Sequence, residues 1–178
     1  MYGVCKYIFV DHAIERKYIV FLAMKSLNEQ IDLLESFIPK YADLAPSTSK
    51  ASVGWHIEHS LLTIQKIIQR VKASDAAEYK SSYKFGRIIV LGFRMIPRGR
   101  AQSPKVVVPE GLIDAASLKI SIYKTRQLLP ELETLTKNQH FSHPVLGVLN
   151  KKPMKKFLRV HTAHHLKIIK DIIRELSS

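Results

Sequence analysis

Cysteine is nearly absent from this sequence, which has a single one, Cys5, among 178 residues. One thiol cannot form an internal disulfide, and the zinc sites built from several cysteines are excluded as well. A chain without a disulfide framework is typical of the cytosol, so we expect a cytoplasmic location. Long apolar runs are also missing: none approaches the ~20 residues of a membrane span, and we expect no membrane partner.

Acidic residues are scarce, with 15 Asp and Glu against 28 Lys and Arg, which gives a formal net charge of +13. The imbalance is strongest at 79–109, where there are seven Lys or Arg and no Asp or Glu. Such an excess permits binding to nucleic acid, acidic lipid or anionic metabolites, but by itself it proves none of them. The segment is either a solvated basic loop or a loop that contacts an anion over a site.

The N-terminal stretch has apolar residues at 7–10 and 18–23, with several charged residues between them. A signal peptide needs an unbroken apolar centre, so this stretch does not fit one. We assign 1–23 to an N-terminal extension and 24–178 to a single domain. One hypothesis is that the native start codon encodes Met24; N-terminal sequencing of native material that begins at Met1 would refute it.

Apolar residues that recur every three or four positions predict long amphipathic helices over most of the chain. They are expected at 24–38, 50–73, 114–135 and 151–176, the last with Asn150 as its N-cap. Pro130 predicts a kink or an early end of the third helix. The stretch 84–95 is apolar enough for a shorter helix or a buried strand, and 136–150 is expected to be a loop. With 46% hydrophobic residues, the sequence indicates an all-α fold with a packed core.

The last helix carries the run His161-Thr162-Ala163-His164-His165. His161 and His165 fall one turn apart near the middle of its apolar face, whereas His164 lies off to the side. Imidazoles that point into a core need partners, and at this spacing the two can share one metal ion. A pair of this kind is often only structural, so a metal-free bundle with hydrogen-bonded histidines stays an alternative.

The second helix offers a third imidazole in its first turns, from either His56 or His59. Helical spacing alone places His56 nearer the apolar centre and does not decide between them. Trp55 is expected in the core, and Glu58 on the surface. Three imidazoles and a water molecule would form an open site for zinc, nickel or another divalent ion. Such an ion could acidify the water or hold a thiolate substrate.

Two segments together resemble the DinB-like (YfiT-like) superfamily of four-helix bundles. Residues 55–59 are similar to the Trp-x-x-x-His at the start of its second helix, and 161–165 to the His-x-x-x-His of its last helix. Residues 96–100 and 143–147 look like a branch with no assigned function. The resemblance, which covers roughly 24–176, implies an up-down-down-up bundle with the basic loop and short helix inserted between the second and third long helices. It also implies metal ligands at His59, His161 and His165, and frequent dimerisation.

The resemblance implies a chemistry as well. Some relatives are thiol-dependent S-transferases that use bacillithiol or mycothiol, and others are described as metal-dependent hydrolases. We therefore expect a thiol S-transferase or a hydrolase that uses zinc or nickel on a small substrate, with a low-molecular-weight thiol as cosubstrate in the first case. The basic segment favours an anionic substrate. The alternatives are a nucleic-acid-binding basic module, against which no known nucleic-acid motif appears, and the metal-free bundle.

Overall fold

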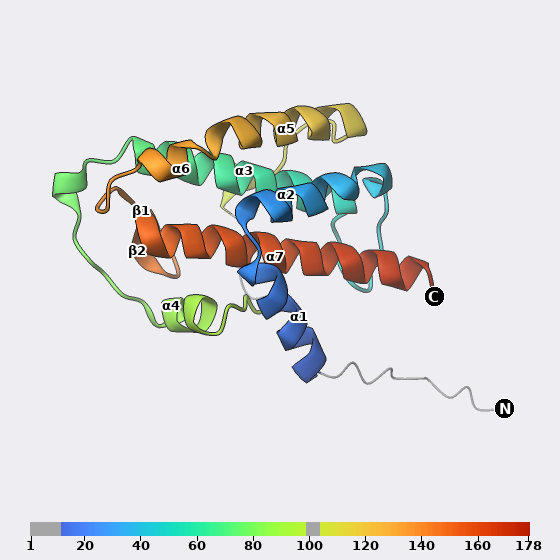
Figure 1. Ribbon diagram of the computed structural model, residues 1–178. Coiled ribbons are helices and arrows are strands. Elements are labelled where there is room, and N and C mark those ends of the chain that lie inside the picture. Colours follow the sequence, from blue (N-terminus) through green and yellow to red (C-terminus); the bar gives the residue numbers. More distant parts are fainter. Residues whose placement is uncertain (1–11, 99–103) are drawn as a thin grey trace.

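The computed structural model describes residues 12–98 and 104–178, and it is mostly helical (Figure 1). Four long helices lie alongside one another: α2 (Leu27–Ser36), α3 (Val53–Lys72), α5 (Ala115–Leu128) and α7 (Lys151–Leu176). In Figure 1, α2 and α7 run toward one end of the bundle, and α3 and α5 run toward the other. The space between them is filled by fully buried aliphatic side chains, among them Ile57, Leu61, Ile64, Leu118 and Leu158. A mostly helical bundle with one packed core is therefore confirmed.

Side chains at the helix N-termini explain where three of these helices begin. Ser26 and Glu29 form a capping box at the start of α2, and Asp114 accepts a hydrogen bond from the Ser117 N–H at the start of α5. Ser52 accepts from the Trp55 N–H at the start of α3. Each cap satisfies a backbone donor that has no partner within the helix. Asn150 precedes α7 as expected, although its side chain makes no capping hydrogen bond.

The chain between α5 and α7 differs in part from the expectation. Helix α5 ends at Leu128 and a short helix, α6 (Glu131–Thr134), follows Pro130, so the early end is confirmed. The expected loop at 136–150 instead contains a hairpin, in which β1 (His140–His143) pairs antiparallel with β2 (Gly147–Asn150). Strands of four residues are too short to give a periodic signal in the sequence.

Residues 12–24 form a helix, α1 (His12–Met24), which packs obliquely against α7 (Figure 1). Its end is buried at Leu22 and Ala23. The Gln30 side-chain amide donates to the Leu22 carbonyl at 2.7 Å and to the Arg159 carbonyl at 3.0 Å, which ties α1 and α2 to α7. The helix thus crosses the boundary that we placed between residues 23 and 24. Residues 1–11 of the expected extension lie outside the described residues, and a native start at Met24 stays a hypothesis.

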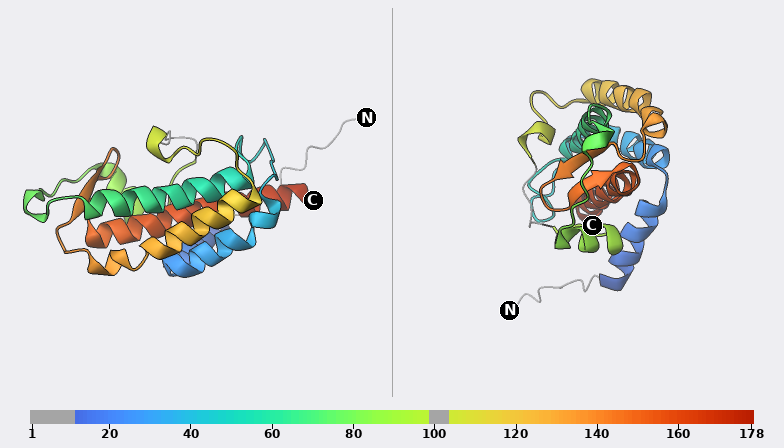
Figure 2. Two further views of the ribbon diagram at one scale, coloured as in Figure 1. Left: turned by 90° about the horizontal axis from the view of Figure 1, so that it is seen from above. Right: turned by 90° about the vertical axis from the view of Figure 1, so that its left-hand side faces the viewer.

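The basic segment runs between α3 and α5, as expected, and it is partly helical. A 3-10 turn, η2 (Ala76–Glu78), precedes it. Within it, α4 (Phe85–Arg87) continues as a π-helical turn, η3 (Ile88–Gly92), and the 3-10 turn η4 (Lys105–Val107) follows near its end. Another 3-10 turn, η1 (Ile38–Lys40), lies outside the segment, after α2. Figure 2 shows α4 on the same side of the bundle as α1. The segment is therefore not merely a solvated loop, because Val90 and Leu91 are buried against α7. Within residues 12–98 and 104–178, no helix has the length and hydropathy needed to cross a membrane.

We expect Gly147→Ala to destabilise the protein by about 1–3 kcal/mol more than Gly111→Ala. Both glycines have positive φ, +77° and +82°, so both alanines carry the left-handed penalty of about 1 kcal/mol. At Gly147 a Cβ would also lie 2.7 Å from the Ser82 carbonyl oxygen, whereas at Gly111 nothing lies within 4 Å. Urea unfolding followed by circular dichroism measures the difference; equal losses would contradict this account of the turn.

Candidate metal centre

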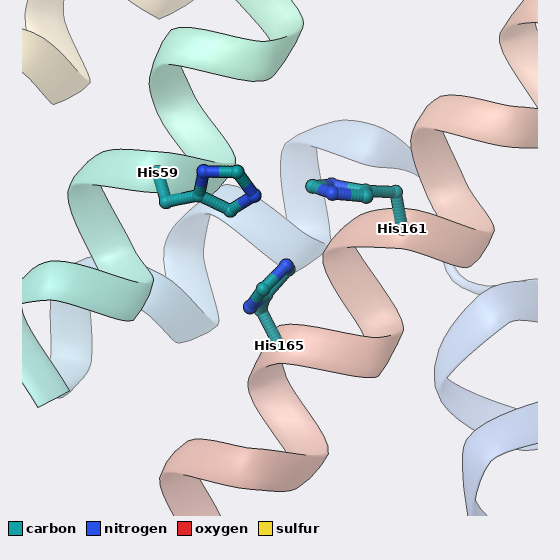
Figure 3. Close-up of side chains that lie close together, drawn as sticks. All are labelled: His59, His161 and His165. Carbon is teal, nitrogen blue, oxygen red and sulfur yellow. The ribbon is translucent and has the colours of Figure 1, made fainter. Parts of the chain in front are cut away.

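Three imidazoles converge between α3 and α7, where His59 of α3 faces His161 and His165 from successive turns of α7 (Figure 3). One nitrogen from each ring lies within 4.8 Å of the corresponding nitrogens of the other two. The ring centroids are 5.1 Å apart for His59 and His161, and 4.6 Å apart for His165 and either of the others. The three residues that the resemblance implied therefore lie close enough together to hold one metal ion.

The orientation of His59 is held from two sides. Its Nδ1 lies 2.7 Å from the Val107 carbonyl oxygen. A carbonyl can only accept, so Nδ1 carries the proton and Nε2 keeps its lone pair. The Trp55 ring stacks on the imidazole, with centroids 4.8 Å apart and planes inclined by 10°. A ring held in this way is oriented for metal binding, because metal-ligating histidines usually donate their second N–H to a carbonyl or carboxylate.

His56 is outside the group formed by His59, His161 and His165, and it contacts that group through His165. The two Nδ1 atoms are 3.0 Å apart, and the other nitrogen of His56, Nε2, is 2.9 Å from the Ser49 hydroxyl oxygen. One of the two Nδ1 atoms must therefore donate to the other. If His165 binds a metal through Nε2, its Nδ1 keeps the proton and donates to His56. Both histidines of α3 thus have a place, His59 within the cluster and His56 in a supporting hydrogen-bond chain.

His161 is the member of the cluster with an unmet polar atom. Its side chain is half-buried, yet its Nδ1 is buried with no hydrogen-bond partner among the described residues. A buried polar atom without a partner costs roughly 1–3 kcal/mol, which a bound ion would relieve. In tetrahedral zinc, bonds of ~2.0–2.1 Å set the ligand nitrogens about 3.4 Å apart. Binding therefore requires the three imidazoles to draw together by an ångström or so, and their chemistry fits a divalent ion.

Burial keeps these histidines neutral at physiological pH. Loss of solvation lowers the pKa of His59, and it lowers the pKa values of His161 and His165 well below 6.5, with help from the neighbouring imidazoles. The same cause, together with His59, His164 and Arg98, lowers the pKa of His56 to about 3. Neutral imidazole is the metal-binding form, so at pH 7 an ion would not have to displace protons from these rings.

Three residues considered in the sequence or near the site, His143, Glu58 and Trp55, do not belong to the three-histidine cluster. His143 fixes the hairpin turn, because its Nδ1 accepts from the N–H groups of Val145 at 3.1 Å and Leu146 at 3.2 Å. Glu58 is half-buried and accepts from the Ser121 hydroxyl of α5 at 3.1 Å, on another side of α3. The expectation that Trp55 is a core residue is wrong, since this half-buried ring stacks on His59.

The Val107 carbonyl and the Ser49 hydroxyl, which support the histidines, could not be predicted from the sequence. The Val107 carbonyl reaches His59 from a position 48 residues later, at the end of the basic segment. Any residue type supplies a carbonyl, so no motif could have marked this position. Ser49 could be read only as a helix-capping residue. The basic segment therefore does reach the site, through its backbone.

No family model matches the chain, and neither a curated protein nor a solved structure matches it. The resemblance to DinB-like proteins thus has no independent support from these comparisons. The geometry and the chemistry of the three histidines are therefore what indicates a function.

We expect the metal-free protein to lose stability as the pH falls below about 6.5, the value at which unfolded histidines take up protons. The folded state, with its lowered histidine pKa values, takes up fewer, so the free energy of unfolding decreases toward acid pH. Each histidine that stays neutral contributes up to about 1.4 kcal/mol per pH unit. Urea unfolding of the chelator-treated protein between pH 7 and pH 4 measures the slope.

His56→Gln provides the matched control, because it removes one histidine whose pKa is lowered to about 3 and leaves the cluster intact. The slope should then decrease by about 1.4 kcal/mol per pH unit. A stability that stays flat to pH 5 in the unmutated protein would show that the buried histidines take up protons as readily as unfolded ones.

Proposed function

We propose that this protein binds one divalent metal ion through His59, His161 and His165 and uses it to activate a small substrate. The observation that carries the proposal is the convergence of one nitrogen from each of three neutral imidazoles to within 4.8 Å of one another. The buried His161 Nδ1, which has no hydrogen-bond partner among the described residues, supports it. The orientation of two of the rings is already set, by Val107 for His59 and by His56 for His165.

Zinc or nickel is the ion that we propose, because imidazole suits both and the candidate ligand group found among the described residues consists of histidines alone. Three protein ligands leave a fourth position for water or substrate, as in catalytic zinc sites. A bound ion supplies a Lewis acid that lowers the pKa of water or holds a thiolate. The chain contributes the positions of the rings, and it contributes an apolar wall at the buried Phe157, whose ring lies 5.5 Å from that of His161.

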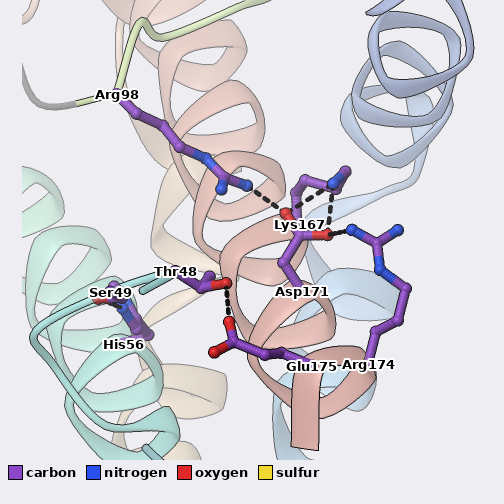
Figure 4. Close-up of polar contacts among 8 residues, drawn as sticks. All are labelled: Thr48, Ser49, His56, Arg98, Lys167, Asp171, Arg174 and Glu175. Carbon is purple, nitrogen blue, oxygen red and sulfur yellow. Dashed lines mark hydrogen bonds and ion pairs between the residues drawn. The ribbon is translucent and has the colours of Figure 1, made fainter. Parts of the chain in front are cut away.

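We further propose an anionic substrate, on the basis of the positive charge near the site (Figure 4). The buried Asp171 receives three cations: Arg98 at 2.5 Å, Lys167 at 2.5 Å and Arg174 at 2.9 Å. Arg98 belongs to the basic segment and is close enough to lower the pKa values of His56 and His164 by its charge. The segment 79–109 to which Arg98 belongs has seven Lys or Arg and no Asp or Glu, so an anion approaching the histidines from this side would be attracted.

Membership of the DinB-like superfamily is part of the proposal. It is supported by the order of helix directions in Figure 1, in which α2 and α7 oppose α3 and α5, and by the histidine positions on α3 and α7. The reactions proposed from this resemblance are thiol S-transfer with a low-molecular-weight thiol and hydrolysis of a small substrate. A cytoplasmic homodimer is proposed on the same resemblance and on the scarcity of cysteine.

Elemental analysis of purified, untagged protein should find close to one zinc or nickel per chain. The variants His59→Ala, His161→Ala and His165→Ala should each lose the metal, because two imidazoles cannot hold it at the concentrations used. His164→Ala is the matched control on the same helix and should retain it. His56→Ala should retain it with an affinity lower by about 10–100-fold, since only the support of His165 is removed.

If the wild-type protein stays metal-free after incubation with zinc, nickel and manganese, the metal proposal is wrong. The histidines would then have a structural role, as hydrogen-bonded residues of a metal-free bundle. Loss of metal in His56→Ala, together with tight binding in His59→Ala, would show that the third ligand is His56.

Cobalt substitution should separate the two proposed reactions. If the fourth position takes a thiol, adding a low-molecular-weight thiol should produce a sulfur-to-cobalt charge-transfer band that is absent from His161→Ala. Hydrolysis without a thiol predicts no such band and a rate that depends on the deprotonation of bound water. Absorption spectra of the cobalt protein with and without thiol give the answer.

A further inference from the structure

The segment that contains α4 and η3 exposes an unusual number of large apolar side chains. Tyr83 and Phe85 are each 76% exposed, Ile88 is 60% exposed and Phe93 is 50% exposed. Single exposed apolar residues are ordinary, but four within eleven positions form a patch of the kind that marks a binding surface. We call these four residues the outer face.

The geometry of the short helix explains why these residues point outward. Helix α4 runs directly into η3, and Val90 and Leu91 on one side are buried against α7. Phe85 and Ile88 are three positions apart and so share the opposite side. The Lys84 ammonium donates to the Pro144 carbonyl at 2.6 Å, which fixes the segment to the hairpin. The packing of Val90 and Leu91 against α7 therefore directs the outer face away from the core.

Basic residues accompany the outer face along the chain. Lys80, Lys84, Arg87 and Arg94 flank the four residues in sequence, and no acidic residue occurs from 79 to 109. The neighbouring α1 adds Arg16, whose guanidinium carbon lies 5.4 Å from the centre of the Phe93 ring. Apolar side chains among basic ones, in a stretch of sequence without Asp or Glu, are complementary to a surface that is apolar below a layer of negative charge.

We propose that the outer face binds the surface of an anionic lipid bilayer. Phe85 and Ile88 would enter the boundary between headgroups and acyl chains, while the basic side chains would contact the phosphate groups, as on interfacial amphipathic helices. No spanning segment is needed. The proposal departs from the expectation of no membrane partner, which considered only membrane spans, and it does not depend on the metal centre.

Single-stranded nucleic acid fits this face less well, because bases need free aromatic faces on which to stack. The Arg87 guanidinium carbon lies 4.4 Å from the centre of the Tyr83 ring, and Arg16 covers Phe93. Ile88 offers no ring. A second copy of the chain also fits less well, because a symmetric contact would bring two basic rims together.

Co-sedimentation with vesicles tests the proposal. The protein should sediment with phosphatidylcholine vesicles that contain phosphatidylserine, much less with phosphatidylcholine alone, and less at high salt. Phe85→Ser/Ile88→Ser should bind at least about tenfold more weakly. The matched control is Ile120→Ser/Tyr123→Ser on α5, which removes a pair of the same spacing, 56% and 65% exposed, next to Lys119 and Lys124. Circular dichroism of both variants verifies folding.

Equal binding by the two double variants, or equal binding to both kinds of vesicle, would overturn the proposal. So would a concentration-dependent dimer in sedimentation velocity that only Phe85→Ser/Ile88→Ser abolishes, since a second copy would then cover the face. Oligonucleotide binding that depends on the same pair, without vesicle binding, would assign the face to nucleic acid. His161→Ala should bind vesicles as the wild type does, which separates this result from that of the metal experiment.

Discussion

The contact between α3 and α7 is the arrangement on which the candidate centre depends. The two helices run in opposite directions, and their facing sides bring His59 and His56 of α3 against His161 and His165 of α7. Residues one turn apart on one helix thus meet residues one turn apart on the other. Because these helices face each other across the core that contains Ile57 and Leu158, the imidazoles lose solvation and stay neutral.

The same contact gives the histidines different roles. A ring that binds a metal uses the lone pair of one nitrogen, and a hydrogen bond from its other nitrogen fixes the orientation of the ring. Val107 does this for His59, and His56 with Ser49 does it for His165. His161 Nδ1 has no such arrangement among the described residues. The supporting groups come from the loop before α3 and from the basic segment, so the centre joins parts of the chain that are far apart in sequence.

The helices could be predicted from the sequence because their apolar periodicity extends over many turns, and Pro130 marked the early end of α5. The pair His161 and His165 could be found from its spacing on that periodic face. The choice between His56 and His59 could not, because the rotation of α3 depends on what covers its other sides, and only a resemblance to known motifs favoured His59. The hairpin at 140–150 was missed because each strand is too short for its alternation to be distinguished from a loop.

The hydrogen bond from His59 to the Val107 carbonyl makes the site sensitive to the backbone at position 107 and not to the side chain there. The acceptor is a main-chain atom, so every amino acid at position 107 supplies it, and substitutions of the buried Val107 side chain would report its packing and not this hydrogen bond. What matters instead is the path of the backbone through η4, which presents that oxygen. Tolerance to substitution at 107 would therefore say little about its importance, whereas an insertion or deletion beside it would shift the oxygen away from the ring.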